Sequence, residues 1–309
     1  MTAVTAILGK VLVIFILIVV GYSISKYGLL TDPGGKDITA ILMKLVVPCV
    51  IITAFIDSKG SLSVAEMAAA TLIALLATLI SLGIAQISFR NAAPERRSVL
   101  RFSITFSNVG FMGLPLAQGI VGELGVIYAS FGVVVFNIFC WTYGYRMMNS
   151  QAKLSLRTVL LNPGVIGLAL GLPVYFLNLN VPAVIAEPMG MISQLNTPLA
   201  MLVIGSYIAK LDFRSFLADK HLYQVSFLRL IVSPTLFLLL MLLVRRVYPI
   251  PSALMVTGII QSAAPSAANC VLFAIQYEKD SILASKIVAL TTLISVLTLP
   301  LFILIGQGN

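Results

Sequence analysis

Charged residues are scarce in this chain. Asp, Glu, Lys and Arg make up 10% of its 309 residues, against about 25% in an ordinary soluble domain, and 59% of the residues are hydrophobic. No polar connection is longer than about ten residues, which leaves little chain for a catalytic or nucleic-acid-binding domain outside a membrane. We therefore expect one all-α polytopic membrane domain over residues 1–309, in contact with lipid and without a nucleic-acid partner. We therefore interpret the net charge of +9 as reflecting the orientation of the chain in the membrane and not a phosphate-binding surface.

Residues that carry enzyme chemistry are also few. His221 is the only histidine, and the chain has no H-E-x-x-H sequence, no paired-aspartate metal motif and no Ser–His pair expected at one depth. Residues 34–37 (Gly-Gly-Lys-Asp) lack the upstream glycine and the following hydroxyl residue of a phosphate-binding loop. We therefore expect neither an enzyme nor a cofactor or metal site.

Acidic residues are absent from the expected middle of the membrane. The chain has 11 of them, and all fall near the ends of apolar segments, which disfavours a proton pump with a buried carboxylate relay. Coupling to Na⁺ through carbonyl and hydroxyl oxygens stays open, and so does another form of H⁺ coupling. Cys49, Cys140 and Cys270 lie within apolar segments, where we expect free thiols and no disulfide.

Apolar stretches of about 20 residues recur about once every 30 residues, which predicts about ten transmembrane helices. The first stretch has neither a basic n-region nor a small-residue cleavage site, so we expect it to be span 1 and not a signal peptide. In chain order, the predicted spans are 6–27, 38–56, 64–89, 98–121, 124–148, 160–178, 186–209, 222–247, 252–276 and 281–306.

The basic residues predict how these spans are oriented. Of 20 Lys and Arg residues, about fourteen fall on one side of the alternating spans and about three, Lys59, Arg245 and Arg246, on the other. Cytoplasmic loops carry the excess of Lys and Arg. We therefore expect a multi-pass protein of the cell membrane with both termini outside and the central loop, about residues 149–159, in the cytoplasm.

The second half of the chain repeats features of the first. Leu45 and Pro48 of span 2 recur 150 residues later as Leu195 and Pro198 of span 7. A second set recurs with an offset of 155 residues: Glu123, Ile127, Ala129 and Ser130 become Glu278, Ile282, Ala284 and Ser285. A repeat of five helices reverses its direction in the membrane, so we expect two inverted repeats, 1–150 and 158–309, as in many secondary transporters.

Spans 4 and 9 carry residues that interrupt helices near their middle. Span 4 has Gly110, Gly113 and Pro115 after Ser107 and Asn108, and span 9 has Pro265 among small and polar residues. Proline removes a backbone donor, glycine permits non-helical angles, and freed backbone groups are costly in lipid. We therefore expect two broken, crossing helices around a polar cavity, where free N–H groups favour a carboxylate or another small anion. The alternative is a pair of proline kinks in helices that face lipid.

These residues resemble the auxin efflux carrier family, which includes plant auxin carriers and bacterial transporters of malonate- or malate-like acids. The resemblance rests most on residues 108–116, Asn-Val-Gly-Phe-Met-Gly-Leu-Pro-Leu, and on Pro265-Ser-Ala-Ala-Asn269, Phe273-Ala and Asp280-Ser-Ile-Leu. Val47-Pro48, Asn162-Pro163 and Arg229 with Pro234 are also similar to family patterns. The likeness covers nearly the whole chain.

The resemblance implies a ten-helix fold in which spans 1, 2, 6 and 7 form a scaffold, often the dimer contact, and spans 3–5 and 8–10 form a moving transport domain. It implies a homodimer and an organic anion held where helices 4 and 9 cross. Asn108 matches the asparagine near the substrate carboxylate in the plant carriers, and Pro265 matches their span 9 proline. The plant carriers have proline where this chain has Ser107, so we expect the unwinding of span 4 to shift toward Gly110–Pro115.

Several other residues are candidates near the crossing. The predicted substrate-binding set is Ser107, Asn108, Gly110, Gly113, Pro115, Asn196, Thr197, Ser262, Pro265, Ser266 and Asn269, with Gln261 sharing the second break. Packing between helices is the alternative role for Asn108, Asn196 and Thr197. Pro48, Pro198 and Arg229 are predicted structural or anion-bracing residues. For Arg229 the reason is that a charge within a span indicates function. Lys10 and Lys44 are expected to extend toward the membrane surface, and Gly167 and Gly171 form a GxxxG pair that permits a dimer contact.

The sequence therefore predicts a secondary transporter that moves a mono- or dicarboxylate by alternating access around the crossing of spans 4 and 9. An anion channel is the first alternative, because broken helices also line pores. A membrane-bound sensor on the same scaffold is the second. The sequence leaves the particular carboxylate, the direction of transport and the coupling ion open.

Overall fold

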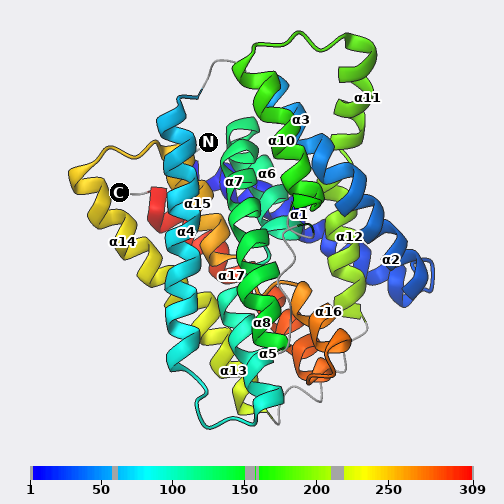
Figure 1. Cartoon of the computed structure of the whole chain (residues 1–309). Coiled ribbons are helices and arrows are strands. Elements are labelled where there is room, and N and C mark those ends of the chain that lie inside the picture. The colour runs from blue at the N-terminus through cyan, green and yellow to red at the C-terminus, as the bar shows by residue number, and fades with distance from the viewer. Residues whose placement is uncertain (1–2, 58–61, 150–156, 158–159, 210–218, 308–309) are drawn as a thin grey trace. The chain divides into compact units, whose positions relative to one another are not determined.

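The computed structural model describes residues 3–57, 62–149, 157, 160–209 and 219–307. In these ranges the regular elements are α-helices and short π-helices (Figure 1). In chain order they are α1 (Ala3–Lys26), α2 (Asp32–Ile41), η1 (Leu42–Val46), α3 (Val47–Asp57), α4 (Val64–Ile87), α5 (Pro94–Thr105), η2 (Val109–Gly113), α6 (Leu114–Val121), α7 (Glu123–Phe139), η3 (Cys140–Gly144), α8 (Tyr145–Met148), α10 (Pro163–Phe176), α11 (Ala183–Ser193), α12 (Asn196–Ala209), α13 (Lys220–Phe227), η5 (Leu228–Val232), α14 (Ser233–Val247), α15 (Ser252–Ala263), α16 (Asn269–Gln276) and α17 (Ser281–Gln307).

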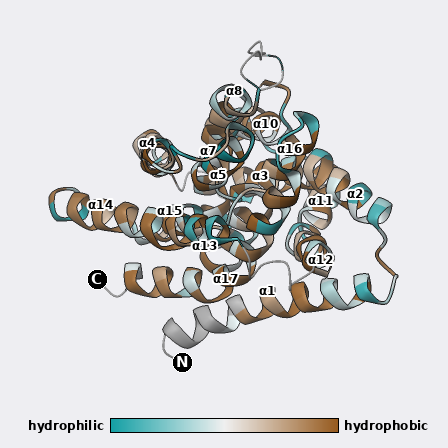
Figure 2. Cartoon of the chain, turned by 90° about the horizontal axis from the view of Figure 1, so that it is seen from below, coloured by the Kyte–Doolittle hydropathy of each residue, from teal (hydrophilic) through white to brown (hydrophobic). Residues whose placement is uncertain are grey.

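Six helical runs are long and apolar enough to cross a membrane: 32–57, 64–87, 123–148, 183–209, 220–247 and 281–306. Shorter apolar helices lie at 15–26, 109–121, 163–176 and 252–263. Each of the ten predicted spans therefore overlaps helix, the described part of the chain is all-helical, and the protein is a multi-pass membrane protein. The hydrophobic colouring of α14 along most of its length, with a hydrophilic end, is visible in Figure 2.

The chain divides into two compact units. Unit 1 comprises Met1–Thr71, Gly110–Val134 and Arg157–Lys210, and unit 2 comprises Leu72–Val109, Val135–Leu156 and Leu211–Asn309. The boundaries fall within α4, η2 and α7, so each of these elements contributes residues to both units.

Unit 1 is built from helices that approach one another closely at glycine. A Cβ atom added to Gly205 of α12 would lie 2.1 Å from the carbonyl oxygen of Ile18 in α1, and one added to Gly21 of α1 would lie 2.4 Å from that of Leu202. A side chain at either position would therefore push α1 and α12 apart. Small residues allow helices in membranes this close approach of backbones.

The GxxxG pair of span 6 is used inside unit 1. A Cβ at Gly167 of α10 would lie 3.0 Å from the Cα atom of Pro48 in α3, and a Cβ at Gly171 would lie 2.4 Å from the ring of Phe55. In Figure 1, α10 and α3 run side by side. The dimer contact that the GxxxG pair permitted is therefore not available on this face, because α3 of the same chain covers it. The predicted bracing residue Pro48 acts here as a packing partner.

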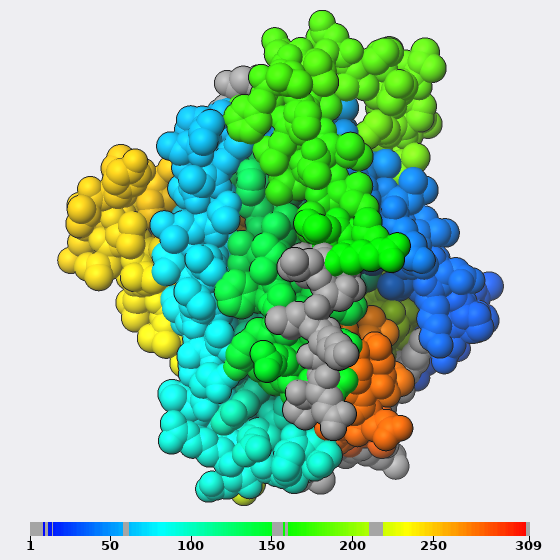
Figure 3. Space-filling model, viewed as in Figure 1, coloured from blue at the N-terminus to red at the C-terminus, as the bar shows by residue number. Residues whose placement is uncertain are grey.

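Unit 2 packs around a hydrophobic core formed by α5, α16 and α17, with Phe102, Phe106 and Phe273 in edge or tilted contact. On α14, Phe237 and Met241 are buried, whereas Leu236, Leu239 and Leu243 are exposed. Helix α14 is the segment drawn in yellow in Figure 3. Large apolar side chains on the outside are typical of a helix that faces lipid.

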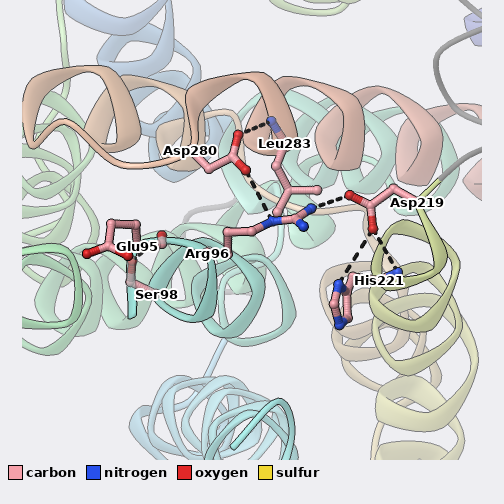
Figure 4. A network of polar contacts seen from close by, with 7 residues as sticks. All are labelled: Glu95, Arg96, Ser98, Asp219, His221, Asp280 and Leu283. Carbon is pink, nitrogen blue, oxygen red and sulfur yellow. Dashed lines mark hydrogen bonds and ion pairs between the residues drawn. The ribbon is translucent and has the colours of Figure 1, made fainter. Parts of the chain in front are cut away.

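Arg96 joins three helix N-termini of unit 2. It forms ion pairs with Asp219, which caps α13 through the N–H of His221, and with Asp280, whose carboxylate accepts the N–H of Leu283 near the start of α17 (Figure 4). The Arg96 Nε to Asp280 Oδ2 distance is 3.2 Å. Burial, the largest influence, raises the pKa of Asp219, but the hydrogen bonds from Arg96 and from the N–H of His221, together with the charges of both residues, bring that pKa below its ordinary value.

Candidate functional site

Helices are interrupted within both spans 4 and 9. Helix α5 ends at Thr105 and α15 at Ala263, and each is followed by a few non-helical residues. Ser107 and Ser266 form an antiparallel β-bridge. The N–H of Asn108 donates to the carbonyl of Pro265 at 2.7 Å, and that of Ala267 donates to Phe106 at 2.9 Å. The two unwound segments therefore pair with each other, which satisfies backbone groups that would otherwise be costly in a membrane.

The unwound part of span 4 lies earlier than expected. The non-helical residues are Phe106–Asn108, whereas Gly110 and Gly113 belong to the π-helix η2, and Pro115 is the second residue of α6. The predicted shift of the unwinding toward Gly110–Pro115 is therefore wrong. Pro115 lies inside the helical run 109–121, directly after the π-helix η2, and local π-type adjustment is one way in which a membrane helix accommodates proline.

Arg229 is the largest fully buried side chain among the described residues. It is 1% exposed, lies in the π-helix η5, and has no carboxylate among its partners in the described residues. Its Nη1 donates to the carbonyl of Ile104 at 2.9 Å and to the hydroxyl of Ser81 at 3.1 Å. Its Nε donates to the carbonyl of Ala264 at 3.0 Å, and its Nη2 donates to that of Ser262. Arg229 thus binds the C-terminal ends of α5 and α15, the two helices that precede the breaks.

Ser266 links the second break to two more helices. Its hydroxyl donates to the carbonyl of Ser103 in α5 at 2.9 Å, and its N–H donates to the hydroxyl of Thr291 in α17 at 3.2 Å. The side chain is fully buried. Ser266 therefore holds the unwound segment 264–268 in place, since both of its polar groups already have partners in the protein.

Three further predicted residues lie beside the paired segments. Asn108 is 6% exposed and follows the β-bridge directly. Ser262, near the end of α15, is 2% exposed, and its hydroxyl has no hydrogen-bond partner among the described residues. Asn269 begins α16, and its amide nitrogen lies 3.8 Å from the sulfur of Cys140. These side chains bring polar groups to the place where both helices are unwound.

The start of α16 has no side-chain cap. Its N-cap residue is Ala268, which has no side chain able to cap the first turn. The N–H groups of Cys270 and Val271 turn back to the carbonyls of Ala267 and Ala268. The N-terminus of a helix carries partial positive charge, so this end favours an anion over a cation.

The remaining predicted residues belong to unit 1. They are Gly110, Gly113, Pro115, Asn196, Thr197, Pro48 and Pro198. Asn196 is the first residue of α12 and is 1% exposed, and its amide nitrogen has no partner among the described residues of the chain. Pro198 lies in the first turn of α12, where proline is tolerated. Within unit 2, the structure brings together Ser107, Asn108, Ser262, Pro265, Ser266 and Asn269.

Several residues of this site were not predicted. Ser81 accepts from Arg229 and lies 2.6 Å from the hydroxyl of Ser233. Ser103 and Thr291 hold Ser266. Serine and threonine in apolar helices commonly bond the preceding turn of their own helix, so the sequence offered no signal that these hydroxyl and carbonyl groups meet another span. Among the described residues, no group of His, Cys, Asp and Glu could hold a metal ion.

Comparison with known proteins places the chain among transporters. The model of a family described as membrane transport protein matches it twice, at residues 6–157 and 152–303. An uncharacterized transporter from Methanothermobacter thermautotrophicus is 23% identical over 304 residues, which cover 94% of this chain and 96% of the relative. An uncharacterized transporter from Methanocaldococcus jannaschii is 25% identical over the same length and with the same coverage.

Proposed function

Because the chain belongs to the membrane transport protein family, the family of the auxin efflux carriers, we propose that it is a secondary transporter of small organic anions. Its substrate is a mono- or dicarboxylate, and it works by alternating access around the paired breaks at Phe106–Asn108 and Ala264–Ala268. Discontinuous helices of this kind form the substrate sites of many secondary transporters.

The observation that carries this proposal is the difference between the helix ends at the breaks. The C-terminal ends of α5 and α15 are covered by the guanidinium of Arg229, while α16 begins at the second break without a side-chain cap. With the negative ends compensated, the positive N-terminal end is left to interact with a ligand. This electrostatic balance supports an anion as the substrate.

Asn108, Ser262 and Asn269 are the proposed substrate-binding residues. Asn108 and Asn269 carry amides that can donate to a carboxylate, and the hydroxyl of Ser262 is buried without a partner among the described residues. A buried hydroxyl without a partner is costly, and a carboxylate oxygen would satisfy it. Arg229 and Ser266 are assigned the supporting role of holding the unwound segments, because their polar groups are engaged within the protein.

The larger arrangement is proposed on the same basis. The two matches of the family model support a repeated architecture of ten spans, with repeats 1–150 and 158–309 inverted in the membrane. Unit 1 contains spans 1, 2, 6 and 7, and unit 2 contains spans 8–10, which supports a division into scaffold and transport domain. In this proposal both termini lie outside the cell. The protein forms a homodimer through a surface other than the face of Gly167 and Gly171.

A transport assay with purified protein in liposomes tests this function. The assay measures uptake of radiolabelled mono- and dicarboxylates with and without Na⁺ and pH gradients. We expect saturable uptake of at least one carboxylate. Single-channel currents, or a flux that does not saturate, would instead indicate an anion channel. Tight binding of a carboxylate without any flux would indicate a sensor.

A further inference from the structure

Arg229 lies where two negative helix ends meet. The carbonyl groups in the last turn of an α-helix lack partners within the helix. Ile104 is in the last turn of α5, Ser262 is in the last turn of α15, and Ala264 follows α15 directly. All three carbonyls accept hydrogen bonds from the one guanidinium.

The charges of this arrangement balance. The C-terminal end of a helix is equivalent to about half a negative elementary charge, so two such ends amount to about one negative charge. The guanidinium of arginine carries one positive charge at every relevant pH. Because Arg229 is 1% exposed and has no carboxylate among its partners in the described residues, the helix ends are the groups that compensate its charge.

The same oxygens form the kind of site that a small cation occupies. Three carbonyls and the hydroxyl of Ser81 surround the guanidinium. Carbonyl and hydroxyl oxygens are ligands for hard cations, and in transporters with broken helices the unwound carbonyls and half-helix C-termini coordinate Na⁺ or H⁺. An arginine in this place therefore supplies permanently the charge that a bound cation supplies transiently.

We propose that Arg229 is a built-in cation that replaces a coupling ion at the breaks, so that the site takes its anion without Na⁺. The π-helix η5 and the contact between Ser81 and Ser233 position the guanidinium for this role. This inference rests on the proposed function for its biological meaning, but it makes a claim about cation binding that can be tested without any substrate.

Thermal unfolding of the purified full chain in detergent tests the claim. Cys49, Cys140 and Cys270 are free and buried, so a thiol-reactive fluorescent dye reports unfolding. The melting temperature Tm is measured in chloride salts of choline, Na⁺ and guanidinium at one low, constant ionic strength. We expect the wild-type Tm to be the same in choline and Na⁺.

The variant Arg229→Ala removes the built-in cation and leaves its oxygens. We expect its Tm in choline to fall by about 5 °C or more, and Na⁺ or guanidinium to restore about half of the loss by binding the folded state. Arg229→Lys keeps a charge but fewer donors, so its Tm should fall without a response to Na⁺. If Arg229→Ala does not fold, the test is decided by whether Na⁺ changes the Tm of the wild-type protein and of Arg229→Lys.

Arg101→Ala is the matched control. Arg101 also donates to backbone carbonyls, those of Gln86 at 2.9 Å and Ser88 at 3.1 Å at the end of α4, but it binds only one helix end. Its Tm should not respond to Na⁺. Three results would each overturn the proposal. The first is a higher Tm in Na⁺ than in choline for the wild-type or the Arg229→Lys protein. The others are an Arg229→Ala protein equally destabilised in all three salts, and an Arg101→Ala protein rescued like Arg229→Ala. Absence of carboxylate transport would overturn only the proposed function.

Discussion

Different interactions stabilise the interior of each of the two units. In unit 1, α1 and α12 touch backbone to backbone at Gly21 and Gly205, and α10 packs its glycines on α3. In unit 2, hydrogen bonds from Arg229 and Ser266 to backbone carbonyls hold the centre, where two helices are unwound. A body packed through small apolar residues needs no polar group inside the membrane, whereas a body that contains broken helices must supply partners for every freed backbone group.

The difference indicates which unit carries the chemistry. Polar groups inside a membrane are costly and are retained where they bind a ligand or support a site. Unit 2 gathers six of the predicted substrate-binding residues around its breaks, whereas close helix packing is the main feature of unit 1. The three predictions that follow test this contrast, beginning with the largest expected effect.

Gly205→Leu should disrupt unit 1. The first carbon of any side chain at this position would lie 2.1 Å from a backbone oxygen of α1, and a backbone cannot yield as a flexible side chain can. We expect loss of the monodisperse folded protein in size-exclusion chromatography. Gly190→Leu in α11 is the control, because a Cβ there meets nothing within 4 Å. A Gly205→Leu protein with wild-type Tm would show that close packing of α1 and α12 does not hold unit 1.

Ser266→Ala should destabilise unit 2 by a smaller amount. It removes the hydroxyl that donates to the carbonyl of Ser103, and hydrogen bonds between spans are worth about 1 kcal/mol. We expect Tm to fall by about 2–4 °C. Ser226→Ala is the control, since this buried hydroxyl bonds only the carbonyl of Leu222 in its own helix. Equal Tm values for both variants would contradict a hydrogen-bonded frame around the break.

Asp219→Asn should have the smallest effect, and that effect should depend on pH. The pKa of Asp219 is below its ordinary value in the folded protein, so its charge stabilises the fold above the unfolded-state pKa, and this contribution is lost as pH falls through the folded-state pKa. The Tm difference between wild type and Asp219→Asn should therefore be present at neutral pH and shrink in acid. Glu95→Gln, at an exposed carboxyl on α5, should change Tm little at any pH. A difference for Asp219→Asn that stays constant down to acid pH would contradict the ion pair with Arg96.

Helix positions and both breaks followed from the sequence for simple physical reasons. Apolar length predicted where helices lie, and each of the ten predicted ranges overlaps helix, with ranges 98–121 and 252–276 interrupted. Proline and glycine among small polar residues predicted that spans 4 and 9 are interrupted. The prediction failed in detail at Gly110–Pro115, because these residues continue the helix that begins with η2, whereas the unwound residues are those that pair with the second break.

Contacts between distant segments were beyond the sequence. The pairing of Ser107 with Ser266 and the four bonds of Arg229 join residues far apart in the chain, and no local pattern encodes which hydroxyl or carbonyl a buried group will meet. The GxxxG pair shows the same limit. Its small residues correctly indicated close packing, but only the fold shows that the partner is α3 of the same chain.

The most direct test of the anion site measures uptake of the carboxylate found in the liposome screen. The proteins compared are wild type, Asn108→Ala, Pro265→Ala and the control Ser226→Ala. We expect Asn108→Ala and Pro265→Ala to lower saturable uptake by about tenfold or more, a loss of about 1.4 kcal/mol in transition-state or binding free energy, while both remain folded and Ser226→Ala transports normally. Wild-type uptake by both Asn108→Ala and Pro265→Ala would contradict a substrate site at the paired breaks.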